Sequence, residues 1–163
     1  MTDRIQPIIV TDTREQAPLI FRSLSSVPGT LITGDYSITG LEDEFCVERK
    51  TLDDLTGCMT RERDRFEREL HRMRGYRFAR VLIVGRSTDL ASGEYRSRLN
   101  AKSAMHTLYA WEARYSPVVF TFCPSVGLAA ELVERWAYWF AREYVRRGVE
   151  LGKAGAGQET CQE

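Results

Sequence analysis

Short apolar runs alternate with helical segments along most of this chain, and the alternation limits the folds that it can adopt. Residues 8–10, 79–85 and 118–122 have the apolar, β-branched character of buried strands. The spacing of apolar residues predicts helices over about 61–74, 97–114 and 125–147, with a short helix after Thr51. Strands interleaved with helices predict an α/β sandwich.

The connecting segments are less regular. Pro18 and the pair Pro28-Gly29 favour irregular structure over residues 13–29, and residues 85–93 read as a loop. Two strands, over 30–38 and 44–49, are expected on either side of a turn at Gly40. The chain turns polar and glycine-rich after Gly148, so we expect one domain over residues 1–148 and a disordered tail over 149–163.

Composition excludes several classes of protein. The 163 residues suffice for one domain with a hydrophobic core, and a net charge of zero gives no global argument for nucleic-acid binding. No apolar stretch approaches the roughly 20 residues of a membrane span, and the first residues do not begin a signal peptide. The cysteines are scattered, which disfavours a zinc site or a disulfide framework and favours a cytoplasmic location: Cys46, Cys58, Cys123 and Cys161.

Two carboxylates and an amine lie on the predicted strand pair. Strand alternation puts Glu48 and Lys50 on one face and Arg49 on the other, while Asp35, beside Gly34, would lie next to Glu48 across the hairpin. Converging carboxylates suit a hard divalent cation such as Mg²⁺, which activates water and stabilises charge on a phosphoryl group. The alternative is a set of solvated charges at strand ends, with Glu48 paired to Lys50.

The same residues resemble a known motif. Gly34-Asp35, Glu48-Arg49-Lys50 and Asp54 are similar to G-D-xn-E-R-K-x3-D of XPF-type structure-specific endonucleases, the xeroderma pigmentosum F family. Residues 9–15, Ile-Val-Thr-Asp-Thr-Arg-Glu, look like the first strand and D-x-R-E turn of that family. Residues 80–85 and 103–121 resemble later elements, so the resemblance covers about residues 5–145.

The resemblance implies a restriction-endonuclease-like three-layer fold, with a central mixed sheet flanked by helices. It implies a DNA endonuclease that cuts branched or flapped DNA near single-strand/double-strand junctions. Asp35 and Glu48 would bind Mg²⁺, or Mn²⁺ as a substitute, with Asp12 as a third acidic ligand. Lys50 would be the catalytic lysine, and Arg49 and Asp54 would complete the catalytic set.

Some of these residues have an alternative structural role. Thr51-x-x-Asp54 also reads as a helix capping box, so Asp54 could act by holding a helix and the adjacent lysine in place. For Arg14 and Glu15 we favour a structural ion pair over direct catalysis.

The predicted helix over 61–74 carries arginines along one face. Arg61, Arg65, Arg68 and Arg72 recur at helical spacing, and guanidinium groups bind phosphate oxygens well. The alternative is a solvated face with internal ion pairs. Beside a nuclease site we favour DNA binding, which would be specific for shape rather than sequence.

The last predicted helix is rich in aromatic residues. Its apolar stripe, together with part of the preceding helix, exceeds what a small monomer usually buries. Because nuclease domains of the XPF-type family dimerise through this region, we expect a homodimer that uses Tyr109, Trp136, Trp139 and Phe140. The alternative is a single amphipathic core helix.

The resemblance has one gap. Family members usually carry a tandem helix-hairpin-helix module after the nuclease domain, and too few residues follow Gly148 for one. We therefore expect an accessory DNA-binding partner or a different substrate preference, and a bacterial or phage origin. The other hypotheses are a non-catalytic DNA-binding or scaffold subunit of a nuclease complex, and a structural assembly protein.

Overall fold

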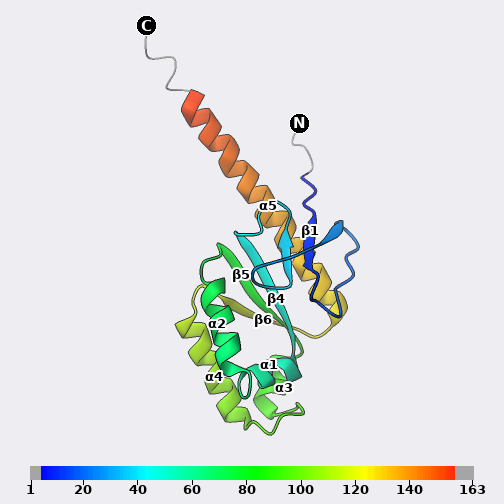
Figure 1. Ribbon diagram of the computed structural model, residues 1–163, viewed down its shortest axis with the longest axis vertical. Coiled ribbons are helices and arrows are strands. Elements are labelled where there is room, and N and C mark those ends of the chain that lie inside the picture. The colour runs from blue at the N-terminus through cyan, green and yellow to red at the C-terminus, as the bar shows by residue number, and fades with distance from the viewer. Residues whose placement is uncertain (1–4, 157–163) are drawn as a thin grey trace.

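A mixed β-sheet forms the centre of the molecule (Figure 1). The computed structural model describes residues 5–156, and within them six strands follow the order β2-β1-β3-β4-β5-β6. β1 pairs parallel with β2 and antiparallel with β3, β3 pairs antiparallel with β4, and β4, β5 and β6 run parallel. The strands are β1 (Ile9–Asp12), β2 (Ser26–Gly29), β3 (Tyr36–Ile38), β4 (Phe45–Thr51), β5 (Phe78–Val84) and β6 (Val119–Cys123).

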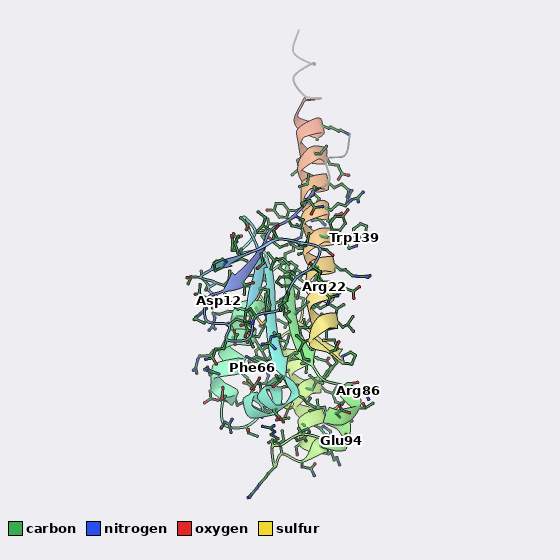
Figure 2. The ribbon with its side chains drawn as sticks, turned by 90° about the vertical axis from the view of Figure 1, so that its right-hand side faces the viewer. Asp12, Arg22, Phe66, Arg86, Glu94 and Trp139 are labelled. Carbon is green, nitrogen blue, oxygen red and sulfur yellow. The ribbon has the colours of Figure 1, made fainter. Side chains whose placement is uncertain are left out.

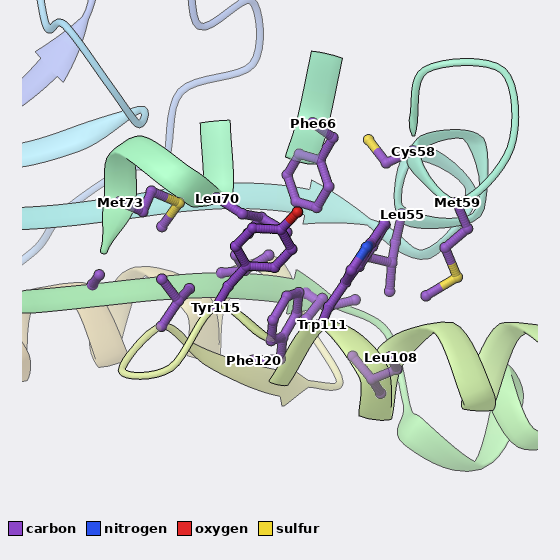
Figure 3. Close-up of a cluster of buried hydrophobic side chains, with 14 of the residues drawn as sticks. Leu55, Cys58, Met59, Phe66, Leu70, Met73, Leu108, Trp111, Tyr115 and Phe120 are labelled. Atoms are coloured by element: carbon purple, nitrogen blue, oxygen red, sulfur yellow. The ribbon is translucent and has the colours of Figure 1, made fainter. Parts of the chain in front are cut away.

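Helices cover both faces of this sheet, which gives the three layers expected of a restriction-endonuclease-like fold (Figure 2). One face packs against the helices that surround Trp111 in a buried cluster (Figure 3). The other face packs against the first half of a single long helix. The helices are α1 (Leu52–Cys58), α2 (Arg63–Met73), α3 (Ser87–Ser92), α4 (Ala101–Arg114) and α5 (Val126–Ala156).

The end of α5 differs from the sequence-based expectation. The helix passes through Gly148 and projects beyond the sheet (Figure 1), so residues 149–156 are helical rather than disordered. Ion pairs at helical spacing, Arg146 with Glu143 and Glu150, and Arg147 with Glu143, support this exposed stretch. The rest of the expected tail, residues 157–163, lies outside the described residues.

Two further elements occupy segments that we expected to be irregular. β2 lies within 13–29, where its pairing with β1 tolerates Pro28 because β2 is an edge strand. α3 lies within 85–93 and ends at Gly93, whose left-handed backbone stops the helix. The strand expected over 30–38 is shorter, beginning at Tyr36, so residues 30–35 form a loop that leads into the hairpin. Across residues 5–156 the structure contains no helix with the length and apolar character that crossing a bilayer requires.

Candidate active site

The β3–β4 hairpin places Asp35 beside Glu48. Gly34 has a left-handed backbone (φ 82°), and a Cβ there would lie 2.6 Å from the sulfur of Cys46, so only glycine fits. The Asp35 N–H donates to the Val47 carbonyl at 2.9 Å. Its carboxylate Oδ2 accepts from the backbone N–H of Arg49 at 2.7 Å. The acid is therefore held against β4, between Glu48 and Lys50.

Glu48 and Lys50 project from the same face of β4, as strand alternation predicted. Lys50 Nζ donates to Glu48 Oε1, and the two side chains are only 15% and 6% exposed. The Lys50 ammonium also lies 5.4 Å from the ring centre of Phe66 on α2. The pair therefore lies under the α2 layer, where water is scarce.

The electrostatics of this site favour a bound cation. Burial raises the pKa of Asp35 to about 6, although the Arg49 N–H opposes the shift. Burial and the neighbouring Asp35 raise the pKa of Glu48 well above its usual range. Burial disfavours the charged form of Lys50, but the carboxylate of Glu48 outweighs it and raises the pKa of Lys50, which stays an ammonium. Two crowded carboxylates are the hard oxygen donors that Mg²⁺ and Mn²⁺ prefer, so these residues fit a divalent cation.

Asp12 does not join this pair, contrary to our expectation of a third metal ligand. Its buried carboxylate accepts from the Leu31 N–H at 2.7 Å and from the Arg14 N–H and Nε at 2.8 Å each. The Arg14 guanidinium and these N–H groups lower the pKa of Asp12 to about 2. With its oxygens occupied by donors, Asp12 anchors the loop after β1 and has little capacity left for a metal ion.

Arg49 and Glu15 pair with each other. The Arg49 side chain leaves the Glu48 face, as alternation predicted, and binds Glu15 Oε1 at 3.0 Å and the Ala17 carbonyl at 3.1 Å. The expected pairing of Arg14 with Glu15 was wrong, because Arg14 binds Asp12 and Glu15 binds Arg49. The Arg49–Glu15 pair is largely buried and ties β4 to the loop after β1.

Asp54 caps α1. The Thr51 hydroxyl donates to Asp54 Oδ2 at 2.7 Å and accepts from the Asp54 N–H at 3.1 Å, which confirms the capping box. Asp54 is exposed, and its carboxylate oxygen is held by Thr51 at the end of the strand that carries Lys50. Its contacts are those of a residue that positions Lys50 through the start of the helix.

The four arginines expected on one helix face divide into two groups, and Arg61 lies in the turn before α2, which begins at Arg63. Arg72 has a partner within the protein: its Nε donates to the Thr33 hydroxyl at 3.2 Å, in the loop before Asp35. Arg61 and Arg65 are both largely exposed. Arg61 pairs loosely with Glu62 at 3.8 Å, whereas Arg65 donates a hydrogen bond to the same carboxylate in a surface ion pair. Arg68 is exposed as well, so three of the four arginines are available to a ligand.

Three glutamates have roles that the sequence analysis missed. Glu67 of α2 accepts from Trp111 Nε1 at 2.9 Å and from the Tyr115 hydroxyl at 3.2 Å. Glu134 of α5 caps three successive N–H groups, those of residues 22–24. Glu69 lies on α2 with Phe66 and Arg72 at intervals of three residues, a spacing that was readable from the sequence as one helix face.

The residues expected at a dimer interface fall into two environments. Trp136 and Phe140 pack against the sheet, and Phe140 lies 5.4 Å from the ring of Phe45. Trp139 is 62% exposed and Tyr109 is 57% exposed. Tyr109 belongs to α4, on the opposite face of the sheet from α5, so these four residues do not form one continuous surface.

The three layers, the sheet order and the Asp35–Glu48–Lys50 site define a restriction-endonuclease-like α/β domain. The ERCC4 domain model matches residues 11–134, and this chain belongs to that family. The chain is 32% identical over 138 residues to the DNA repair endonuclease XPF of Cricetulus griseus, covering 79% of this chain and 15% of that protein.

Two solved structures have the same fold. XPF from Aeropyrum pernix aligns with a TM-score of 0.65 at 23% identity, covering 80% of this chain and 60% of that one. XPF from Aeropyrum pernix in complex with DNA aligns with a TM-score of 0.65 at 21% identity, covering 84% of this chain and 66% of that one. The chain thus spans less than two thirds of the proteins that it matches.

Proposed function

We propose that this protein is a metal-dependent endonuclease that hydrolyses phosphodiester bonds in DNA. The observation that carries the proposal is the convergence of Asp35, Glu48 and Lys50 at one buried site of the β3–β4 hairpin. Membership of the ERCC4 domain family and the resemblance to two XPF proteins support the same activity.

Each side chain of the site has a role that its environment favours. Asp35 and Glu48 would hold Mg²⁺, with Mn²⁺ as a substitute, and the bound ion supplies Lewis acidity and an activated water. Lys50 keeps Glu48 in place, and its ammonium can stabilise negative charge that develops on the phosphoryl group. The Asp35–Arg49 hydrogen bond fixes the first acid relative to the strand that carries the other two groups.

We propose branched or flapped DNA, cut near a single-strand/double-strand junction, as the substrate. Exposed Arg65 and Arg68 lie on α2, the helix that covers the site, and exposed Arg61 lies in the turn just before it. All three suit phosphate contacts, which read shape rather than sequence. XPF from Aeropyrum pernix has been solved in complex with DNA, which supports DNA as the ligand class.

The cleavage assay compares labelled flap, splayed-arm and duplex DNA in Mg²⁺. Wild type should cut a branched substrate, whereas Asp35→Asn and Lys50→Ala should cut at least about 100-fold more slowly, because each removes a charge that acts on the transition state. Asp43→Asn, which removes an exposed acid from the same hairpin, is the matched control and should cut like wild type. If wild type binds DNA but cuts none of these substrates, the protein is a non-catalytic subunit instead.

We also propose a homodimer and an accessory DNA-binding partner. Trp139 lies beside a groove of about 660 Å³ along α5, together with Tyr138, Val145 and Val149. If this surface holds the dimer, wild type should sediment as a dimer in sedimentation velocity and Trp139→Ala should sediment as a monomer. The proposed phosphate contacts come from α2 and the turn before it, and a partner would add contacts to the rest of a branched substrate. Buried free thiols at Cys46, Cys58 and Cys123 support a reducing, cytoplasmic location.

A further inference from the structure

The structure leaves the proposed metal site with two motif carboxylates, since Asp12 is occupied by Arg14 and Leu31. We propose that Glu69 of α2, which lies outside the recognised motif, supplies the third carboxylate that binds the divalent cation with Asp35 and Glu48. The inference rests on the proposed function, because it concerns the metal ion of that same site.

The position of Glu69 follows from its neighbours on α2. Phe66 is buried against Lys50, whose Nζ lies 5.4 Å from the ring centre. Arg72 donates to the Thr33 hydroxyl, two residues before Asp35. Residues three apart on a helix lie on one face, so Glu69 lies between the side chain that supports Lys50 and the one that holds the Asp35 loop. Glu69 therefore faces the site from the layer above it.

The carboxylate of Glu69 is uncommitted. It is half-buried, yet it forms no hydrogen bond or ion pair with any residue in the described range 5–156. Glu67, two residues earlier, is held by Trp111, Tyr115 and Arg63. The Glu69 carboxylate is therefore free to bind a cation.

The charge of Glu69 already acts on the site. It raises the pKa of Asp35 and of Glu48, although burial is the larger cause in both, and it also favours the charged form of Lys50. These interactions agree with the helix geometry in placing a third negative charge near the pair.

Asp35, Glu48 and Glu69 would have to move together to share one ion. Within residues 5–156 no three His, Cys, Asp or Glu side chains form a ready-made metal site. Three like charges stay apart without a counter-ion, whereas a divalent cation draws oxygen ligands together. The glutamate side chain can swing toward the ion, bound directly or through a coordinated water, because it has three rotatable bonds.

Metal binding without DNA tests the inference directly. Mn²⁺ is titrated into the full chain and free Mn²⁺ is followed by electron paramagnetic resonance, with Asp35→Asn as a reference for loss of the site. Glu69→Gln should raise the apparent Kd for Mn²⁺ about tenfold, an effect expected when one contributor to a metal site is removed. Asp64→Asn removes an acid from an exposed position of α2 and should change the Kd less than twofold, on the order expected for a surface substitution.

Thermal unfolding in EDTA separates a metal-binding role from a structural one. Glu69→Gln should unfold at the wild-type temperature or above, because it removes repulsion with Asp35 and Glu48. Added Mn²⁺ should then raise the unfolding temperature less in Glu69→Gln than in wild type. A lower unfolding temperature in EDTA, or unchanged Mn²⁺ affinity, overturns the inference.

The outcomes also separate the inference from the proposed function. If wild type cuts flap DNA and Asp35→Asn loses Mn²⁺ while Glu69→Gln does not, only the assignment of Glu69 fails. If wild type binds no Mn²⁺ and cuts no DNA, the proposed function fails with it.

Discussion

Asp12 and Asp35 lie at the ends of neighbouring strands, yet their carboxylates are in opposite electrostatic states. Asp12 accepts from a guanidinium and two backbone N–H groups, and these donors lower its pKa to about 2. Asp35 accepts from one backbone N–H, and burial raises its pKa to about 6. Both residues belong to the acidic set that the sequence motif suggests for metal binding.

The comparison shows that the number of donors around an acid decides its role better than its place in a motif. A carboxylate saturated by donors is stable as an anion and serves as an anchor. A buried carboxylate that has few hydrogen-bond donors and lies beside a second carboxylate is stabilised when a cation binds. The structure therefore assigns Asp12 to the scaffold and Asp35, with Glu48, to the binding site.

Removing the charge of Asp12 should produce the largest change in stability. Asp12→Asn leaves the buried Leu31 N–H and the Arg14 guanidinium poorly paired, and should lower the free energy of unfolding by about 3 kcal/mol. Asp35→Asn can keep the bond to the Arg49 N–H and removes repulsion with Glu48, so it should cause no loss. Urea unfolding in EDTA measures both variants. Equal losses would contradict the distinction between anchor and binding site.

The two aspartates should also give stability opposite dependences on pH. The pKa of Asp12 is lowered from 3.8 to about 2, so the unfolded chain binds the extra proton between these values and stability rises with pH. The pKa of Asp35 is raised from 3.8 to about 6, so the folded protein binds the extra proton there and stability falls as pH rises. Each slope is about 1 kcal/mol per pH unit.

Urea unfolding in EDTA at several pH values measures this effect. The fall in stability between about pH 4 and pH 6 should be smaller in Asp35→Asn than in wild type. Mn²⁺ should restore stability most strongly above pH 6, where Asp35 is ionised and can bind it. An unchanged fall in Asp35→Asn would mean that other acids, Glu48 among them, cause it.

Local patterns in the sequence predicted the parts of the site that depend on local geometry. Strand alternation separated Glu48 and Lys50 from Arg49, because a strand has a fixed period of two. The capping box joins Thr51 to Asp54, three residues later in the first turn of α1, so the sequence predicted it as well. The position of Asp35 beside Glu48 was also predictable, because the two residues lie close in sequence within one hairpin of paired strands.

The wrong predictions involve partners that are distant in the sequence. The role of Asp12 depends on the Leu31 N–H, which lies next to Asp12 because β2, just before Leu31, pairs with β1. β2 itself forms through pairing with β1, and its sequence of Ser-Val-Pro-Gly carries no strand signal. The extension of α5 past Gly148 depends on ion pairs that offset the low helix propensity of glycine.

Asp54 sharpens the comparison, because its carboxylate also has local donors and should behave as an anchor. Thr51→Ala and Asp54→Ala each break the capping box and should each lower the free energy of unfolding by about 1 kcal/mol. If Asp54 acts only through this cap, both variants should slow DNA cleavage by the same small factor. A much slower cleavage by Asp54→Ala than by Thr51→Ala, at equal stability, would move Asp54 from the anchors to the catalytic residues. Cleavage rates normalised to the folded fraction make that distinction, since the two variants remove opposite ends of the same hydrogen bonds.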